Sequence, residues 1–231
     1  MALNVLSAGA AQGVVTAFAE RLKSETGHEL AGTFGAVGMI KERFLGGAPA
    51  DLLILTAPQI AELVREGHLV AGTAANLGVV RTGVAVRAGD PLPDIADGRA
   101  LRASLLAADA IYFPDPERAT AGIHFARVLD ALEIRSDVGE RLRPFPNGAT
   151  AMRELAQAAG SRPLGCTQIT EINSTPGVVL VGALPREFEL ATTYSLGVSA
   201  HAVARDAAQR LAAWVTGDDS RALRTRMGFE F

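Results

Sequence analysis

Four short loops of small residues are the segments of this sequence best suited to chemistry. They span residues 8–12, 35–38, 119–122 and 147–150, and each lies between a predicted strand and a predicted helix. The first N–H groups of a helix have no partner inside the helix, and the helix dipole adds positive potential there. Because small side chains let a ligand approach this backbone closely, the four loops together predict a site for a small anion.

The first loop, "SAGAAQG", does not match the common nucleotide or hydrolase motifs. GxGxxG is absent, no acidic residue follows the second predicted strand to bind a ribose, and neither GxxxxGK[ST] nor GxSxG occurs in the chain. These absences argue against a dinucleotide, a nucleoside triphosphate and a serine nucleophile. Ser7 is therefore expected to be a strand-end serine that hydrogen bonds to the turn backbone.

Two side chains near the third loop could take part in chemistry. His124 begins a predicted helix, and we favour an exposed or capping residue there over a catalytic one. Arg118 lies in the loop before that helix, where a solvated charge and the counter-ion of a carboxylate are equally good interpretations.

Composition excludes several other kinds of site. The 231 residues include 22 basic and 25 acidic ones, which gives a net charge of −3 without a long basic run, so nucleic acid is not an expected partner. Cys166 is the single cysteine, which rules out an intramolecular disulfide and predicts a buried small apolar residue. The four histidines never fall at ligand spacing, so neither a metal ion nor another cofactor is expected.

The N-terminal segment "MALNVLSAGA" has neither a basic region nor a long apolar region typical of a secretory leader. No apolar run approaches the roughly 18 residues of a membrane span. As written, the sequence predicts a cytoplasmic protein, and a periplasmic one if a leader has been trimmed away.

The elements that must position the loops form two α/β sets in a chain that is 48% hydrophobic. The first set has predicted strands at residues 3–6, about 29–34 and 51–56, and helices at about 11–23, 39–45 and 58–66. The second has strands at 110–113, 164–167 and 177–181, and helices at 124–132 and 151–159.

Extended segments before the second set and after it connect the two sets. The tail returns through "ELATTYSLGVSA" to a helix whose apolar face includes Leu211 and Val215. The sequence therefore predicts two α/β lobes joined by a double-crossover hinge, residues 1–83 with 193–231 as one lobe and residues 84–192 as the other.

A set of motifs resembles, in order and spacing, the molybdate-binding type of bacterial solute-binding protein. The resemblance covers essentially the whole chain and includes the ending in Gly228 and Phe229; "GGAPADLLIL" is its most specific element. The other motifs are "VLSAGAAQGVVTAFAERL", "FPDPERATAG", "NGATAMREL", "GCTQITEI" and "WVTGDDSRALRTRMGFEF".

This resemblance implies a type II periplasmic-binding-protein fold, with two α/β lobes that close over an oxyanion held by neutral hydrogen-bond donors. It implies a small anionic ligand and, if the chain is exported, an ABC transporter permease as partner. With the loops above, it predicts the ligand-binding residues Ala10, Ala11, Gln12, Ala36, Val37, Gly38, Arg118, Thr120, Ala121, Gly148, Ala149, Gln168 and Thr170.

The sequence departs from the molybdate binders at the ligand shell itself. Ala10 replaces the first-loop serine, Ala36, Val37 and Gly38 replace the second-loop serines, and Gln168 replaces the tyrosine. Each lost hydrogen bond to a charged group is worth roughly 1.5–3 kcal/mol. Smaller side chains also leave a larger cleft. Together with the loss of these hydroxyls, the larger cleft favours an organic di- or tricarboxylate over molybdate.

Some proteins similar to this family are isomerases of unsaturated polycarboxylates such as aconitate. Such a reaction requires removal and return of a proton next to a carboxylate-binding crevice, and the general base would be His124 or Glu171. The sequence thus leaves three hypotheses open: a binding protein for a small anion, which we favour, an isomerase on the same scaffold, and a sensor that signals its closed state to a protein partner.

Overall fold

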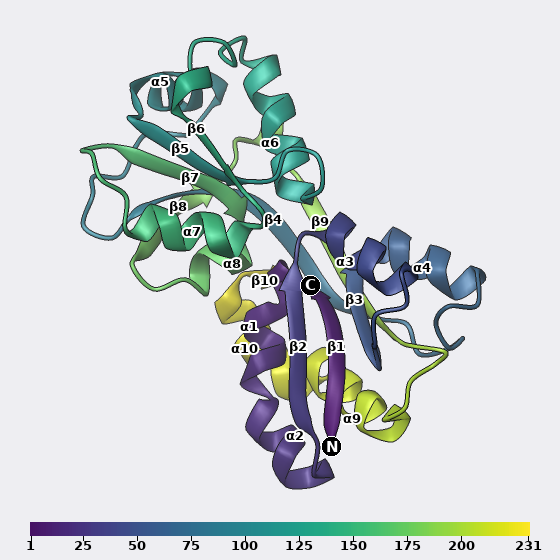
Figure 1. Ribbon diagram of the computed structural model, residues 1–231. Helices are drawn as coiled ribbons and strands as arrows, with labels where there is room; N and C mark the ends of the chain where they lie inside the picture. Colours follow the sequence, from purple (N-terminus) through teal and green to yellow (C-terminus); the bar gives the residue numbers. More distant parts are fainter. The chain divides into compact units, whose positions relative to one another are not determined.

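Two long strands, β4 (Ala75–Arg87) and β9 (Ala191–Val198), carry the chain from one structural unit into another (Figure 1). The computed structural model describes all residues, 1–231. Unit 1 comprises Met1–Val80 with Thr192–Phe231, and unit 2 comprises Arg81–Ala191. The lobe boundaries expected from sequence were 83/84 and 192/193.

The sheet of unit 1 has the order β2-β1-β3-β9-β4. β1 (Ala2–Ala8) pairs in parallel with β2 (Glu29–Gly35) and with β3 (Leu52–Thr56), and β3 pairs antiparallel with β9. The short β10 (Phe229–Glu230) pairs antiparallel with β4. Leu52 to Leu55 of β3 are all fully buried, as expected for a strand of a parallel sheet covered on both faces.

The helices of unit 1 connect these strands or follow the last of them. The connecting helices are α1 (Gln12–Ala17), α2 (Ala19–Thr26), α3 (Val37–Leu45) and α4 (Ala57–Arg65), and α9 (Arg205–Thr216) and α10 (Arg221–Met227) follow β9.

The single helix predicted at about 11–23 is wrong in one respect. A 3-10 turn at Gly9–Ala11 comes first, and the helix then breaks at Phe18, which separates α1 from α2. The Phe18 ring stacks on Trp214 of α9 with 6.4 Å between ring centroids. The predicted range therefore covers both helices but misses the interruption between them.

The sheet of unit 2 has the order β4-β7-β5-β6, and β8 also pairs with β4. β5 (Ala110–Pro114) is parallel to both β6 (Leu142–Phe145) and β7 (Pro163–Gln168), whereas β4 is antiparallel to β7 and to β8 (Val178–Ala183). The helices are α5 (Gly98–Ala107), α6 (Thr120–Ala131), α7 (Gly148–Ala156) and α8 (Ile169–Asn173). Short 3-10 turns lie at Gly139–Arg141 and Arg186–Phe188 in unit 2 and at Asp218–Ser220 in unit 1.

The core of unit 2 lies between its sheet and its helices. Fully buried residues such as Ile111 of β5, Phe125 of α6 and Leu101 of α5 belong to one cluster. No helix in the structure combines the length and the apolar character that a membrane span requires.

Parallel strands place the loops that follow them at one edge of each sheet. In unit 1, Ala8 and Gly35 are paired residues at the ends of β1 and β2, so the loops to α1 and α3 leave side by side. In unit 2, β5, β6 and β7 run in parallel, so the loops to α6, α7 and α8 leave from a common edge.

Candidate ligand-binding site

The loops of unit 1 present helix starts without side-chain caps. Ala10 and Ala11 lie in the buried turn before α1, which begins at the half-buried Gln12. Ala36 is the N-cap of α3 and forms no side-chain cap hydrogen bond. The N–H groups of the first turn of α3, which includes Val37 and Gly38, are therefore not satisfied by the cap residue.

Ser7, at the end of β1, behaves as the sequence predicts. Its side chain is fully buried, and its hydroxyl donates to the Ala8 carbonyl oxygen at 2.9 Å. This hydrogen bond to the turn backbone confirms a structural serine.

The loop after β5 leads to a second helix start without a side-chain cap. Ala119 is the N-cap of α6, followed by the half-buried Thr120 and the buried Ala121. A Cβ on Gly122 would collide with the carbonyl oxygens of Pro114 and Asp115, so this tight turn needs glycine. Arg118 is exposed in the same loop, and its backbone N–H donates to Asp115 Oδ1 at 3.1 Å.

The loop after β6 differs from the first three, because the protein itself satisfies its donors. Asn147 caps α7 by accepting the Thr150 N–H at its Oδ1, 2.8 Å away. The Ala149 N–H, which the resemblance assigns to a ligand, donates to the carboxyl group of Glu171. Gly148 lies beside that carboxyl group, where a Cβ would collide with Glu171 Oε2 and Thr167 Oγ1.

Glu171 is the buried acidic side chain at this edge of unit 2. It is 7% exposed, accepts a hydrogen bond from Thr167 Oγ1 at 2.6 Å, and also accepts the Gln168 and Ala149 N–H groups. Burial raises the pKa of Glu171 above its ordinary value, and these hydrogen bonds offset the shift only in part. The bond to the Gln168 N–H is also half of a capping box at the start of α8.

Three buried polar side chains in unit 2 lack partners. Gln168 (both amide atoms), Thr170 Oγ1 and Thr82 Oγ1 form no hydrogen bond, although their residues are 3%, 2% and 1% exposed. Thr82 and Gln168 stand directly opposite each other in the antiparallel pairing of β4 and β7. Buried polar groups in proteins are nearly always hydrogen bonded to protein, ordered water or a ligand, so these atoms are the unsatisfied groups of this region.

Thr82 was not identified from the sequence. The available signal was a hydroxyl residue just before the apolar run "GVAV", where a buried strand is expected to carry apolar side chains. Its pairing with Gln168 depends on the strand register, which no local pattern shows.

His124 lies within α6, and its side chain is half-buried. Its Nε2 is 2.7 Å from the Phe188 carbonyl oxygen, which can only accept, so this nitrogen carries the proton. The expected exposed or capping role is wrong, because the ring connects α6 to the 3-10 turn at Arg186–Phe188. Of the two candidate bases, Glu171 is the one that lies beside the unpartnered groups.

Cys166 is buried in β7, and burial raises the pKa of its thiol. It is 1% exposed and belongs to the apolar cluster of unit 2, which confirms the small apolar residue predicted from the sequence.

Comparison with known proteins identifies related chains. The family model described as bacterial extracellular solute-binding protein matches residues 3–230. The periplasmic molybdate-binding protein of Azotobacter vinelandii superposes with a TM-score of 0.79 at 18% identity, and 99% of each chain is covered. The sulfate-binding protein SubI of Mycobacterium tuberculosis gives a TM-score of 0.74 at 18% identity, with 99% of this chain and 86% of that chain covered.

A curated relative carries the name of an enzyme. Aconitate isomerase from a Pseudomonas species is 26% identical over 227 residues, which cover 94% of this chain and 83% of the relative. The two solved structures resemble this chain in fold at 18% identity. Aconitate isomerase resembles it in sequence, and the aligned residues cover 94% of this chain.

Proposed function

Because the chain belongs to the bacterial extracellular solute-binding protein family, we propose that it binds a small organic anion with two or three carboxylate groups. The observation that supports this most directly is the set of unpartnered polar atoms on Gln168, Thr170 and Thr82. An amide and two hydroxyls offer neutral donors to carboxylate oxygens, and the amide oxygen can accept from a ligand hydroxyl or a protonated carboxyl.

The helix starts without side-chain caps supply further donors in this proposal. In unit 2, α6 begins at an alanine N-cap, so its first N–H groups are available to an anion. In unit 1, α3 also begins at an alanine N-cap and has the same free donors. Within unit 2, the half-buried Thr120 and the exposed Arg118 would add polar contacts to such a ligand.

The apolar side chains in the unit 1 loops favour an organic ligand over a tetrahedral oxyanion. Ala10, Ala36 and Val37 are buried, but none of them has a polar side-chain atom to donate. Each absent hydrogen bond to a charged ligand is worth roughly 1.5–3 kcal/mol, so molybdate and sulfate would bind weakly. An extracellular location and an ABC transporter permease as partner belong to the same proposal.

A thermal-shift panel tests the class of ligand. The panel compares molybdate, tungstate, sulfate and phosphate with succinate, citrate and both isomers of aconitate, each at millimolar concentration. A ligand at 1,000 times its Kd stabilises the folded state by about 4.1 kcal/mol, so a micromolar binder is readily detected. We expect the largest shift from a di- or tricarboxylate, and strong stabilisation by molybdate alone would refute the proposal.

The buried carboxyl group of Glu171 favours a second function, isomerisation of an unsaturated polycarboxylate. Glu171 directly follows Thr170, whose hydroxyl has no partner, and burial raises the pKa of the Glu171 carboxyl group, as for many general bases. The relative named aconitate isomerase supports this candidate. In the reaction, the base removes a proton from the methylene carbon, the electron pair delocalises over the adjacent double bond, and a proton returns at the other end of the allyl unit.

Proton NMR in D₂O separates the two functions. An isomerase converts cis- to trans-aconitate and exchanges the methylene protons for deuterium, whereas a binding protein does neither. Glu171→Gln should abolish exchange and turnover while aconitate still raises the melting temperature. Binding of aconitate by the unmodified protein without exchange or turnover would exclude the enzyme.

A further inference from the structure

A cavity in unit 2 lies apart from the unpartnered cluster. Its volume is about 180 Å³, and its floor includes Val86 of β4 and Leu164 of β7, both buried. These two residues pair at one end of the β4–β7 ladder, and Thr82 pairs with Gln168 at the other end. At about 3.3 Å per residue, the four-residue separation along β4 puts roughly 13 Å between the two places.

The cavity is lined mainly by apolar groups. Pro91, Leu92 and Pro93 form one side, and Ala107 at the end of α5 forms part of another. Leu92 is 63% exposed, although it borders a cavity that could bury it. An apolar cavity of about 150 Å³ is large enough to hold benzene, so this one has room for a molecule with one aromatic ring.

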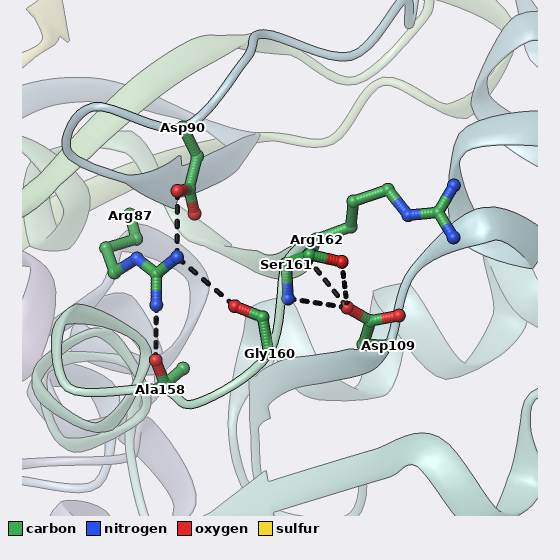
Figure 2. Close-up of polar contacts among 7 residues, drawn as sticks. All are labelled: Arg87, Asp90, Asp109, Ala158, Gly160, Ser161 and Arg162. Carbon is green, nitrogen blue, oxygen red and sulfur yellow. Dashed lines mark hydrogen bonds and ion pairs between the residues drawn. The ribbon is translucent and has the colours of Figure 1, made fainter.

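Asp90 contributes a buried acceptor without a donor to this cavity. Its Oδ1 pairs with Arg87 Nη2 at 2.9 Å, but its Oδ2 is buried and has no hydrogen-bond partner. Figure 2 shows Arg87 joined to Asp90 on one side and to the Ala158 and Gly160 carbonyl oxygens on the other, with one Asp90 oxygen left outside these contacts. The free oxygen requires an N–H or O–H donor.

Hydrogen bonds fix the walls on both sides of the cavity. Asp109 Oδ2 accepts the backbone N–H groups of Ser161 and Arg162 at 2.8 Å each (Figure 2). These bonds lower the pKa of Asp109 and hold it ionised. Ser104, which also lines the cavity, donates its hydroxyl to the Asp94 carbonyl oxygen at 2.7 Å. Both walls are therefore held in place without a ligand.

We propose that this cavity binds a neutral, mainly apolar small molecule of about one ring, which donates one O–H or N–H hydrogen bond to Asp90. A neutral donor fits better than a cation, because Arg87 already balances the Asp90 charge. A second cation would lose its hydration in the apolar cavity for little gain in attraction. This site does not depend on the anion-binding function.

Amide NMR titrations of the ¹⁵N-labelled full chain test the proposal with three probes of similar size: phenol, toluene and benzylamine. Phenol is expected to bind saturably and to shift the signals of residues 90, 92 and 161–162, at least fivefold more tightly than toluene or benzylamine. Asp90→Asn should remove the preference for phenol and leave toluene binding unchanged.

Ala107→Phe is a second variant that does not touch the ion pair. Ala107 is exposed and lines the cavity, so a phenyl ring there should block all three probes without disturbing the core. Ala213→Phe, at an exposed alanine of α9, is the matched control and should bind phenol normally. Equal affinity for phenol and toluene, tighter binding of benzylamine, or unchanged phenol binding by the Ala107→Phe variant would each overturn the proposal.

Discussion

The carboxyl group of Glu171 fills the space where a Cβ of residue 148 would stand. Gly148 is the first residue of α7, and Glu171 comes from α8, so the two helix starts meet at this point. The carboxyl group accepts the N–H of Ala149, the next residue of α7. A buried side chain thus occupies a helix start where the sequence predicts an external anion.

Gly148→Ala should destabilise unit 2, because the added methyl group must displace Glu171 or Thr167 from buried positions. Overpacking of this kind costs typically 1–3 kcal/mol. Urea denaturation would measure the loss. Gly139→Ala is the matched control, since a Cβ there meets nothing within 4 Å and its backbone is not left-handed. Equal stability of the two variants would contradict the packing described above.

Glu171→Gln should reduce the dependence of stability on pH. The pKa of Glu171 is raised in the folded state, so the folded protein binds the proton more tightly than the unfolded chain does. The contribution of Glu171 to the free energy of unfolding is therefore full below its ordinary pKa of 4.5 and is lost as the pH rises through the folded pKa. Glutamine cannot ionise, so the variant should gain stability relative to the unmodified protein as the pH rises above about 4.5.

The same measurement on Glu154→Gln provides the control for that prediction. Glu154 is exposed on α7, so its replacement should leave the pH dependence of stability nearly unchanged. Urea titrations from pH 4.5 to 8 would compare the three proteins. A constant difference between the Glu171→Gln variant and the unmodified protein over this range would show that Glu171 does not titrate as described.

Much of the fold could be predicted because long apolar runs alternate with amphipathic segments. The strands at 52–56 and 163–168 and the helices that follow β2 and β3 lie where the hydrophobic pattern places them. The elements that were missed have weak local patterns. β6 is four residues long and partly exposed, and α8 has only five residues.

Two other helices were missed for different reasons. α5 begins at Gly98, after the N-cap Asp97, whose Oδ1 accepts the Ala100 N–H. The sequence contains this cap, but the preceding proline-rich segment obscured it. α10 carries the buried Arg224, whose guanidinium donates to backbone carbonyl oxygens such as that of Leu77. Because a charged residue is expected to be exposed, the sequence did not indicate that this face of α10 is buried.

The candidate site could be predicted only in part from the sequence. Small-residue loops identify helix starts, and three of those starts, at α1, α3 and α6, do lack side-chain caps. The Asn147 cap of α7 is a local signal, because it joins residues three positions apart. The contact of Glu171 with Ala149 joins residues 22 positions apart, and the pairing of Thr82 with Gln168 depends on strand register. No local pattern encodes such contacts.

Gly38→Asp should abolish anion binding and leave the fold intact. The substitution puts a carboxylate in the first turn of α3, where it competes with an anionic ligand for the same N–H groups. A carboxylate at a helix N-terminus is itself stabilising by about 0.3–1 kcal/mol, so the melting temperature without ligand should not fall. Gly38→Asn has nearly the same shape without the charge and should retain more binding. Equal ligand-induced thermal shifts in both variants would remove α3 from the proposed site.

Gln168→Leu should have opposite effects on stability and on binding. In the protein without ligand, the Gln168 amide is buried with both polar atoms unpartnered, at a cost that leucine of similar size avoids. We expect the free energy of unfolding to rise by about 1 kcal/mol and the affinity for the carboxylate found in the thermal-shift panel to fall at least tenfold. Urea denaturation and isothermal titration calorimetry measure the two effects separately. Gln157→Leu, at an exposed position after α7, should change neither quantity appreciably. A Gln168→Leu variant that loses stability and keeps its affinity would show that this amide serves the fold, because a group held for a ligand is expected to cost stability in the ligand's absence.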